Sequence, residues 1–373
     1  MNGGAKHPGA AYLILMLTTK CNLSCSYCYL GSHINNQASA VSAKTDMTRD
    51  TIDNALKLAN NDKNSLHVQL TGGEPFLVPE LVQYAAEKIR EKFAGATIGI
   101  QTNATLLDNQ AINIIKKSGL EPGISLDGEP LLQDSQRGMA HLTFKGIHLL
   151  EQNKIPFNIT SVVTKANMDS LLRLVLMLGN FSMARGIGLD FLVLRGSAEK
   201  NGISMADARQ AEQGIKDMLK ALNMVNAARK TPLIIREFEK IKRIKKEKKT
   251  NSFCHGATGK SLAVTPEGEL FPCSQTAFDD KFHIGSLKDL KEGSFLCTTL
   301  SEMRLDRYQK KQCIGCDLGL FCPGDCPSRL YYNKGYSAGL ICKVHETFYK
   351  ALKDKEEMDN DLIPEDKKIY GIV

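Results

Sequence analysis

The chain has 373 residues, of which 42% are hydrophobic and 24% charged, and its formal net charge is +7. This length exceeds what a single core usually holds, so one large domain followed by a smaller one is expected. The composition is ordinary for a soluble globular protein. Its first apolar run, Tyr12 to Leu17, is too short for a secretory signal or a membrane span, so a cytoplasmic protein is expected.

Eleven cysteines are distributed at the two ends of the chain. Three lie between Cys21 and Cys28, none lies between residues 29 and 253, and eight lie between Cys254 and Cys342. So many thiols in an intracellular chain favour metal ligation over structural roles. The distribution predicts a catalytic domain followed by an extension that binds metal clusters.

The first three cysteines, Cys21, Cys25 and Cys28, have the spacing CxxxCxxC and follow the first apolar run directly. Thiolates favour iron–sulfur clusters, and three of them leave one iron of a [4Fe–4S] cluster open to a small molecule. Structural zinc would need a fourth ligand, and no further Cys or His lies nearby in the sequence. Zinc stays open as the lesser alternative, and a secreted disulfide framework is disfavoured.

The middle of the chain alternates short apolar runs with helical periods, which is typical of parallel strands joined by crossover helices. The expected strands are Tyr12 to Leu17, Leu66 to Leu70, Thr97 to Ile100, Gly123 to Leu126, Phe157 to Val163 and Leu189 to Leu194. Six such units predict an α/β fold of the partial (β/α)6 type, related to the TIM barrel. Catalytic groups in such folds gather at the C-terminal ends of the strands, where the three-cysteine loop would lie.

The second expected strand ends in the sequence Thr71-Gly72-Gly73-Glu74-Pro75. Together with the three-cysteine loop, this segment resembles the GGEP signature of radical S-adenosylmethionine (radical SAM) enzymes. The resemblance implies that Gly72, Gly73 and Glu74 receive the amino group of the methionine moiety of SAM. Glycines allow the backbone to approach a ligand without an intervening Cβ.

The fourth expected strand leads into Ser125-Leu126-Asp127-Gly128, followed by Asp134 and Arg137. This pattern resembles peptide-maturing radical SAM enzymes. The resemblance implies that Ser125 contacts the ribose of SAM and that Arg137 pairs with its carboxylate, a task that suits a planar guanidinium. It also suggests that Tyr27 packs near the adenine. The alternatives are a solvated surface position for Arg137 and ordinary core packing for Tyr27.

The cysteine spacing of the second half resembles the SPASM extension of the same superfamily. The order is Cys254, thirteen residues, Gly268, four residues, Cys273, and then Cys313, Cys316, Cys322, Cys326 and Cys342. The resemblance implies that one auxiliary [4Fe–4S] cluster is held by four thiols: Cys313, Cys316, Cys322 and Cys342. A second would be held by Cys254, Cys273 and Cys326. A zinc site at Cys313 and Cys316 is the alternative.

The chain departs from the anaerobic sulfatase-maturing branch at two places. Residues 256–260 contain no extra cysteine, and Ser274 stands where that branch has an aspartate. The first difference leaves an auxiliary iron without an obvious protein ligand, and the second removes the expected general base. Cys297 could supply the ligand, although a lone cysteine in an apolar segment is more often buried. His255 is a weaker candidate still, and His345 is expected to be exposed.

We expect a radical SAM domain at residues 1–235, a basic linker at 236–253, a SPASM domain at 254–350 and a tail at 351–373. The basic run from Lys240 to Lys249 is typical of a solvated helix face or loop. It could instead attract an acidic leader peptide or an electron donor. Nucleic-acid binding is disfavoured, because no aromatic residues are interleaved with these charges.

The resemblance implies a radical SAM oxidoreductase with three [4Fe–4S] clusters that cleaves SAM reductively to a 5′-deoxyadenosyl radical. The expected substrate is a ribosomally made peptide that receives a crosslink, thioether or other C–H-derived change. Auxiliary clusters would accept an electron or hold a substrate thiolate. Expected partners are a flavodoxin or ferredoxin, and leader recognition would need either a separate protein or the barrel itself. Formylglycine formation, oxidation of a cofactor precursor and non-catalytic electron transfer remain as alternatives, and no residue that acts on the substrate is indicated.

Overall fold

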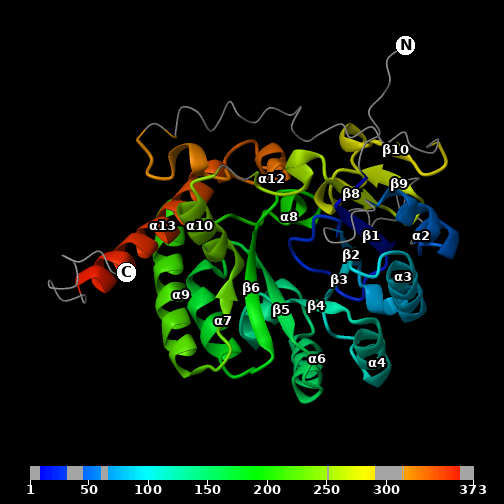
Figure 1. Cartoon of the computed structure of the whole chain (residues 1–373), viewed down its shortest axis with the longest axis horizontal. Helices are drawn as coiled ribbons and strands as arrows, with labels where there is room; N and C mark the ends of the chain where they lie inside the picture. The colour runs from blue at the N-terminus through cyan, green and yellow to red at the C-terminus, as the bar shows by residue number, and fades with distance from the viewer. Residues whose placement is uncertain are drawn as a thin grey trace, which may run out of the picture.

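The structure is a computed structural model that describes residues 9–31, 45–59, 66–249, 252–289, 313 and 315–361. One sheet runs through the described part, in the strand order β10-β9-β8-β1-β2-β3-β4-β5-β6-β7 (Figure 1). The strands are β1 (Tyr12–Thr18), β2 (His67–Gly72), β3 (Thr97–Thr102), β4 (Glu121–Ser125), β5 (Phe157–Val163), β6 (Ala184–Phe191), β7 (Ile234–Ile235), β8 (Ser261–Val264), β9 (Glu269–Phe271) and β10 (Gly285–Ser286). Neighbours from β8 through β1 to β7 pair in parallel, whereas β8, β9 and β10 pair antiparallel.

The strands β1 to β6 confirm the α/β class and the six expected parallel strands. The predicted position of the sixth strand was wrong, since β6 begins at Ala184 and ends at Phe191 instead of running from residue 189 to 194. Gly186 and Gly188 interrupt the apolar run at the start of this strand. Both glycines line a cavity, and a Cβ would lie 2.9 Å from the Ile234 side chain at position 186 and 2.7 Å from the Arg236 side chain at position 188.

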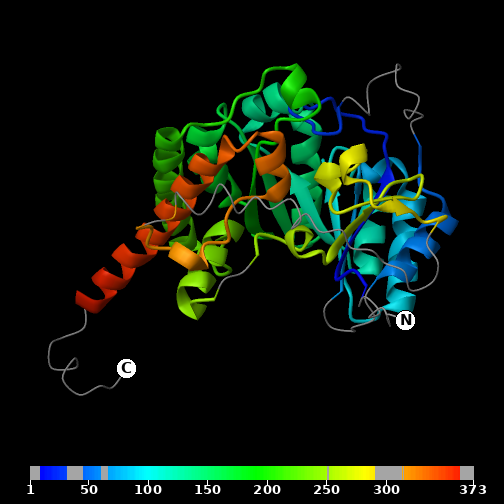
Figure 2. The ribbon, with the colours of Figure 1, turned by 90° about the horizontal axis from the view of Figure 1, so that it is seen from above.

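Helices cover the outer side of the curved sheet, as the two views in Figures 1 and 2 show. The helices of the described ranges are α2 (Arg49–Ala55), α3 (Pro79–Lys92), α4 (Asn109–Ser118), α5 (Pro130–Gln136), α6 (Ala140–Gln152), α7 (Leu171–Leu178), α8 (Ser197–Lys200), α9 (Ala208–Ala228), α10 (Arg236–Glu247), α12 (Pro327–Tyr332) and α13 (Ser337–Asp361). Side-chain caps begin three of them: Thr48 accepts from the Thr51 amide at α2, Asp108 from the Ala111 amide at α4, and Asp207 from the Gln210 amide at α9. No helix in the described ranges is long and apolar enough to cross a membrane.

Short 3₁₀ turns supplement these helices. They span Leu56–Leu58, Pro75–Leu77, Met168–Ser170, Gly256–Thr258, Ser274–Thr276, Asp280–Phe282 and Gly319–Phe321. Two of them flank positions of interest, because one follows the GGEP glycines and another follows Cys273 directly.

Strand β1 is buried on both of its faces. Leu13, Leu15 and Leu17 belong to the main core between the sheet and the helices. Ile14 and Met16, which alternate with them, belong to a second core that includes residues of β8 and β9 and of the loop after β1. Because successive side chains of a strand point to opposite faces, β1 joins the helical layer to the C-terminal extension.

Strands β2 to β6 differ from β1, since their inner positions are mostly polar or glycine while their outer positions are mostly apolar. The polar and glycine positions that line the cavity include His67, Gln69, Thr71, Gly99, Gln101, Glu121, Gly123, Ser125, Asn158, Thr160, Gly186, Gly188 and Asp190, and Val162 is an apolar exception. Closed TIM barrels fill this space with bulky apolar side chains. Here the short and polar side chains leave an open interior.

The C-terminal extension docks on the end of β6 through helix α12. The side-chain amide of Asn333 donates to the Leu192 carbonyl at 2.9 Å, and its oxygen accepts from the Leu194 amide at 2.7 Å. Arg329 donates to the Phe191 carbonyl at 3.1 Å. Residues of the expected basic linker form α10, which packs against α13.

Candidate active site

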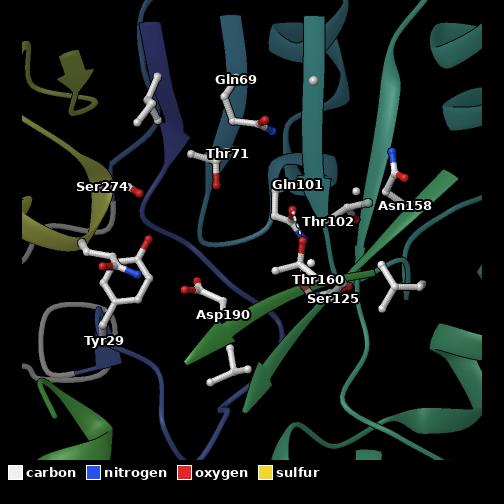
Figure 3. A pocket seen from close by; sticks show the side chains of 18 of the residues that line it. Tyr29, Gln69, Thr71, Gln101, Thr102, Ser125, Asn158, Thr160, Asp190 and Ser274 are labelled. Carbon is white, nitrogen blue, oxygen red and sulfur yellow. Dashed lines mark hydrogen bonds between the residues drawn. The ribbon is translucent and has the colours of Figure 1, made fainter. Parts of the chain in front are cut away.

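A cavity of about 980 Å³ lies on the inner side of the sheet (Figure 3). Its wall is formed by strands β1 to β6, the loop after β1, helix α10 and the residues that follow Cys273. Of the six residues expected to contact SAM, five line it: Tyr27, Gly72, Gly73, Ser125 and Arg137. The sixth, Glu74, is buried behind the cavity wall.

Cys21, Cys25 and Cys28 meet at this cavity, on the loop that leaves the C-terminal end of β1. Each thiol acts electrostatically on at least one of the others. Burial raises the pKa of Cys21 to about 11 and that of Cys28 to about 12. The thiolate forms therefore need a nearby cation such as iron, and metal binding would release the thiol protons. This set of three sulfur donors fits a cluster with one open iron.

Two other segments hold the loop by hydrogen bonds to its backbone. The Ser26 amide donates to the Gln136 carbonyl at 2.8 Å, and the Ser197 amide donates to the Cys28 carbonyl at 2.9 Å. The side chain of Asn201 donates to the Ser26 carbonyl at 2.8 Å. The ends of β4 and β6 thus position the cysteines through the elements that follow them.

Gly72 and Gly73 bring the end of β2 into close contact with the same loop. The Gly73 amide donates to the Thr18 carbonyl and the Glu74 amide to the Lys20 carbonyl, both at 2.8 Å. A Cβ at position 73 would lie 2.0 Å from the Lys20 oxygen. Glycine is therefore required here by the close approach of two backbones.

Glu74 connects β2 to β3 with its carboxylate. It accepts hydrogen bonds from the Phe76 amide at 3.1 Å, the Thr102 hydroxyl at 2.7 Å and the Asn103 amide at 2.7 Å. Burial raises its pKa to about 7, and these three donors lower it in part. The carboxylate stabilises the strand ends from behind the cavity.

Tyr27, Asp127 and Arg137 form a buried cluster beside Cys25. Arg137 donates to both oxygens of Asp127, at 2.9 and 3.4 Å, and its guanidinium lies 5.2 Å from the centre of the Tyr27 ring. The Tyr27 hydroxyl donates to the same carboxylate. The side chain of Arg137 is 9% exposed, so it is not a solvated surface residue.

Ser125 belongs to a chain of hydrogen bonds across the inner face of the sheet. The Gln101 side chain donates to the Ser125 hydroxyl at 2.9 Å, and the Thr160 hydroxyl donates to Gln101 at 3.2 Å. Figure 3 shows these side chains together on one wall of the cavity.

Four further thiols gather at the C-terminal extension. The charges of Cys313, Cys316 and Cys322 all act on Cys342, that of Cys316 acts on Cys313, and those of Cys313 and Cys316 act on Cys322. This is the set that the SPASM resemblance implies. The prediction that His345 is exposed was wrong, because helix α13 buries its ring with Nδ1 3.6 Å from the Cys322 sulfur. Burial lowers the pKa of His345 to about 4.

Cys254, Cys273 and Cys326 form a separate group in which each thiol acts on another. The Cys326 sulfur lies 3.1 Å from the Ser328 hydroxyl and 3.6 Å from the Gln275 side-chain oxygen. Among the described residues, no group of three or more Cys, His, Asp or Glu side chains is arranged so that it could hold a single metal ion.

Two further candidates for a ligand were considered in the sequence. Cys297 lies outside the described residues. His255 is exposed and stacks on Tyr12, with ring centres 5.6 Å apart.

The sequence reasoning missed several residues that build the site. They are Asn22, Asn103, Gln136, Ser197, Asn201 and Gln275, which hold the cysteine loops by hydrogen bonds. Asp127 belongs to the Ser125-Leu126-Asp127-Gly128 motif, but its ion pair with Arg137 was not predicted. Its position between a strand end and an arginine ten residues later was the available signal.

Comparison with known proteins agrees with this geometry. Residues 15–176 match the family model described as the Radical SAM superfamily. The AdoMet-dependent heme synthase of Methanosarcina barkeri is 28% identical over 280 residues, which cover 69% of this chain and 74% of that protein. The subtilosin biosynthesis protein AlbA of Bacillus subtilis is 27% identical over 304 residues, which cover 77% and 59%.

Among solved structures, native anSMEcpe with bound AdoMet superposes with a TM-score of 0.73 at 20% identity, covering 94% of this chain and 99% of that chain. The same protein with bound AdoMet and the Cp18Cys peptide superposes with a TM-score of 0.71. These similarities show a shared fold over nearly the whole length. Residues 15–176 thus form a radical SAM domain, a family that implies a [4Fe–4S] cluster and SAM, and the chain as a whole is similar to the maturase AlbA and shares the fold of anSMEcpe.

Proposed function

We propose that this enzyme modifies a ribosomally synthesised peptide by radical SAM chemistry. The observation that carries the proposal is the arrangement of two thiol groups around one cavity. Cys28 lines this cavity, as do Ser274 and Gln275, which follow Cys273, and the charges of Cys28 and Cys273 both act on Tyr29. A substrate in the cavity would therefore lie near both the SAM-binding cluster and an auxiliary cluster.

Cys21, Cys25 and Cys28 would hold the first cluster and leave one iron for the amino and carboxylate groups of SAM. When bound, the cluster and SAM supply an electron and a 5′-deoxyadenosyl radical. The chain supplies orientation. Asp127 fixes the guanidinium of Arg137, which can then present its remaining N–H groups to the SAM carboxylate. Ser125 would contact the ribose, and Gly72 and Gly73 would approach the methionine moiety.

The polar interior favours a peptide as the substrate. Side-chain amides and hydroxyls of Gln69, Gln101, Asn158 and Thr160 line the wall. They match the donors and acceptors of a peptide backbone, which loses free energy on burial if its polar groups stay unpaired. The similarity to AlbA, a bacteriocin biosynthesis protein, supports the same class of substrate.

The remaining thiols would hold two auxiliary clusters. Cys313, Cys316, Cys322 and Cys342 complete one set of four ligands, and Cys254, Cys273 and Cys326 leave a vacancy in the other. That vacancy borders Gln275, which also lines the cavity. A substrate thiolate could fill it from the cavity side. On this proposal the SPASM domain spans residues 254–350, after the radical SAM domain at 1–235 and the linker at 236–253, with the tail at 351–373.

Anaerobic reconstitution tests the proposal. Three four-iron clusters predict about twelve irons per chain, and dithionite with SAM should yield 5′-deoxyadenosine. Co-expression with short open reading frames beside the gene, followed by mass spectrometry, should reveal a modified peptide. Only zinc, four irons per chain or no 5′-deoxyadenosine would contradict the proposal.

A second candidate is the oxidation of a cofactor precursor, because the Methanosarcina heme synthase is 28% identical. Formylglycine formation is the third candidate, and the shared fold with anSMEcpe supports it. Ser274 argues against it, because a hydroxyl is a far weaker base than a carboxylate. Formylglycine found on a sulfatase peptide after incubation would favour this third candidate.

The electron donor is proposed to be a flavodoxin or ferredoxin. Lys242, Lys245, Lys246 and Lys248 on and after α10 line a second pocket of about 580 Å³, together with Asp317 beside Cys316. Their positive charge would attract an acidic carrier close to the four-thiol group. Reduction by such a carrier should slow with increasing salt, whereas reduction by dithionite should change less.

A further inference from the structure

Asp190 lies on β6 at the edge of the sheet where the cysteine loop is held. It is the penultimate residue of that strand, and its backbone is paired with Val162 of β5. Its side chain is 40% exposed and lines the cavity. In Figure 3 the carboxyl group of Asp190 projects into the cavity on the side of Tyr29 and Ser274.

Two other carboxylates line the cavity among the described residues, and both are placed differently. Glu121 is the first residue of β4, at the opposite end of the parallel strands. Glu239 lies on α10 with an oxygen 3.5 Å from the Lys242 ammonium. Asp190 is therefore the carboxylate at the C-terminal ends of the strands, where catalytic groups of such folds gather.

The cations around Asp190 are engaged by other acids. Arg329 is 4.0 Å away, but it donates to Asp325 with two of its nitrogens. Arg236 acts on Asp190 electrostatically and forms its own ion pair with Glu237 at 2.7 Å. Both cations near the Asp190 carboxylate are thus shared with other acids, and the carboxylate faces the cavity.

Tyr29 and Ser274 stand across from this carboxylate. The Tyr29 hydroxyl is hydrogen-bonded to Ser274, and its pKa is raised, first by burial and then by the charges of Cys28, Cys273 and Asp190. Asp190 therefore acts on the same residue, Tyr29, as one thiol of each group. Ser274 itself cannot act as a base near neutral pH.

We propose that Asp190 is the general base of the reaction, which deepens the proposed function and rests on it. The 5′-deoxyadenosyl radical takes a hydrogen atom from a substrate carbon and becomes 5′-deoxyadenosine. A nucleophilic S–H, N–H or O–H group of the same peptide then bonds to that carbon as its bond to hydrogen breaks. The proton goes to Asp190, and one electron goes to an acceptor of the iron–sulfur class.

The test uses Asp190→Asn in the reconstituted full chain and the peptide that the wild-type enzyme modifies on co-expression. General bases contribute about 10²- to 10⁴-fold, so modified peptide should fall at least about 100-fold. Deuterium transfer from labelled peptide to 5′-deoxyadenosine should continue within about threefold of wild type. Peptide affinity, measured by fluorescence anisotropy without turnover, should also stay within about threefold, because binding precedes the step that needs a base.

Two further variants sharpen the outcome. Glu87→Gln removes an exposed carboxylate on α3, outside the cavity, and should leave product formation unchanged. Asp190→Asn combined with Ser274→Asp places a carboxylate on the facing wall and should restore at least about tenfold of the lost product, a rescue that a purely structural role would not give.

Unchanged product in Asp190→Asn would overturn the proposal. So would a parallel loss of product, deuterium transfer and binding, because that pattern indicates a structural role. If the wild-type enzyme modifies no peptide at all, the failure lies instead with the proposed function.

Discussion

The two groups of three thiols are built in opposite ways. Cys21, Cys25 and Cys28 lie within one loop after β1, where neighbouring segments fix its backbone. Cys254, Cys273 and Cys326 come from three places far apart in the sequence. They meet only because β8 pairs with β1 and because α12 docks on the end of β6.

The comparison shows that two similar sets of three thiols can be positioned in different ways, one by a single loop and the other by tertiary contacts. The first group is prepared by the fold of one loop, so its geometry should survive damage to the C-terminal extension. The second depends on tertiary contacts of that extension. Variants that act on one group and spare the other test this distinction.

The largest effect is expected from Cys25→Ala. Removing this ligand should abolish SAM cleavage completely and lower the iron content from about twelve to about eight per chain. Iron analysis and detection of 5′-deoxyadenosine measure both effects. Loss of all the iron would show that the two regions do not load independently.

Arg329→Met should damage the second group. The Arg329 and Asp325 side chains are 3% and 4% exposed, and breaking a buried pair by removing one partner costs about 3–5 kcal/mol. Denaturant unfolding measures this loss, and iron bound by Cys254, Cys273 and Cys326 should fall. Adding Asp325→Asn should recover part of the stability, since it removes the unpaired buried charge. Equal loss of iron from the first group would contradict the comparison.

Glu74, which lies beside the loop that carries Cys21, Cys25 and Cys28, should make the stability of this region depend on pH. Its folded-state pKa of about 7 lies above the ordinary value of 4.5. Between these values the folded state binds more protons than the unfolded state, so this contribution is fully present below about pH 4.5 and is lost as the pH rises to about 7. The loss is on the order of 3 kcal/mol. Unfolding free energies measured from pH 4.5 to 7.5 should show a shallower decline in Glu74→Gln.

Two glycine substitutions give the smallest and most local contrast. Gly73→Ala places a Cβ 2.0 Å from the Lys20 oxygen, so it should displace the first loop and slow SAM cleavage by about tenfold or more, equivalent to about 1.4 kcal/mol or more. Gly268→Ala, at a φ of +89°, should cost about 1 kcal/mol of stability through backbone strain. It should leave SAM cleavage unchanged, because position 268 lies in the turn between β8 and β9.

Much of this fold could be predicted from the sequence where the signal was local. Alternating apolar runs gave the strands β1 to β5 to within a few residues, and the spacing of Cys21, Cys25 and Cys28 indicated one loop. Strand β6 was misplaced, because its inner positions are Gly186 and Gly188 and carry no apolar signal. A sequence pattern cannot show that a cavity, and not a core, faces a strand.

The rest depended on contacts between distant segments. The pairing of β8 with β1 gave no local signal, because parallel pairing of strands some 250 positions apart is decided by packing. His345 is buried because α13 docks on the rest of the protein, and the sequence of α13 alone does not indicate this burial. Asp190 lay in an expected strand, and only the orientation of that strand placed its carboxylate in the cavity.

Cys322 and Cys326 are separated by three residues, yet they belong to different thiol groups. Asp325, within this short connection, is fixed by Arg329 and by the Ser337 hydroxyl at 2.7 Å. Filling one group therefore restrains a ligand of the other. Binding of a cluster at either auxiliary site should therefore favour binding at the other, whichever site is filled first. Chains with a single auxiliary cluster should then be scarce during assembly.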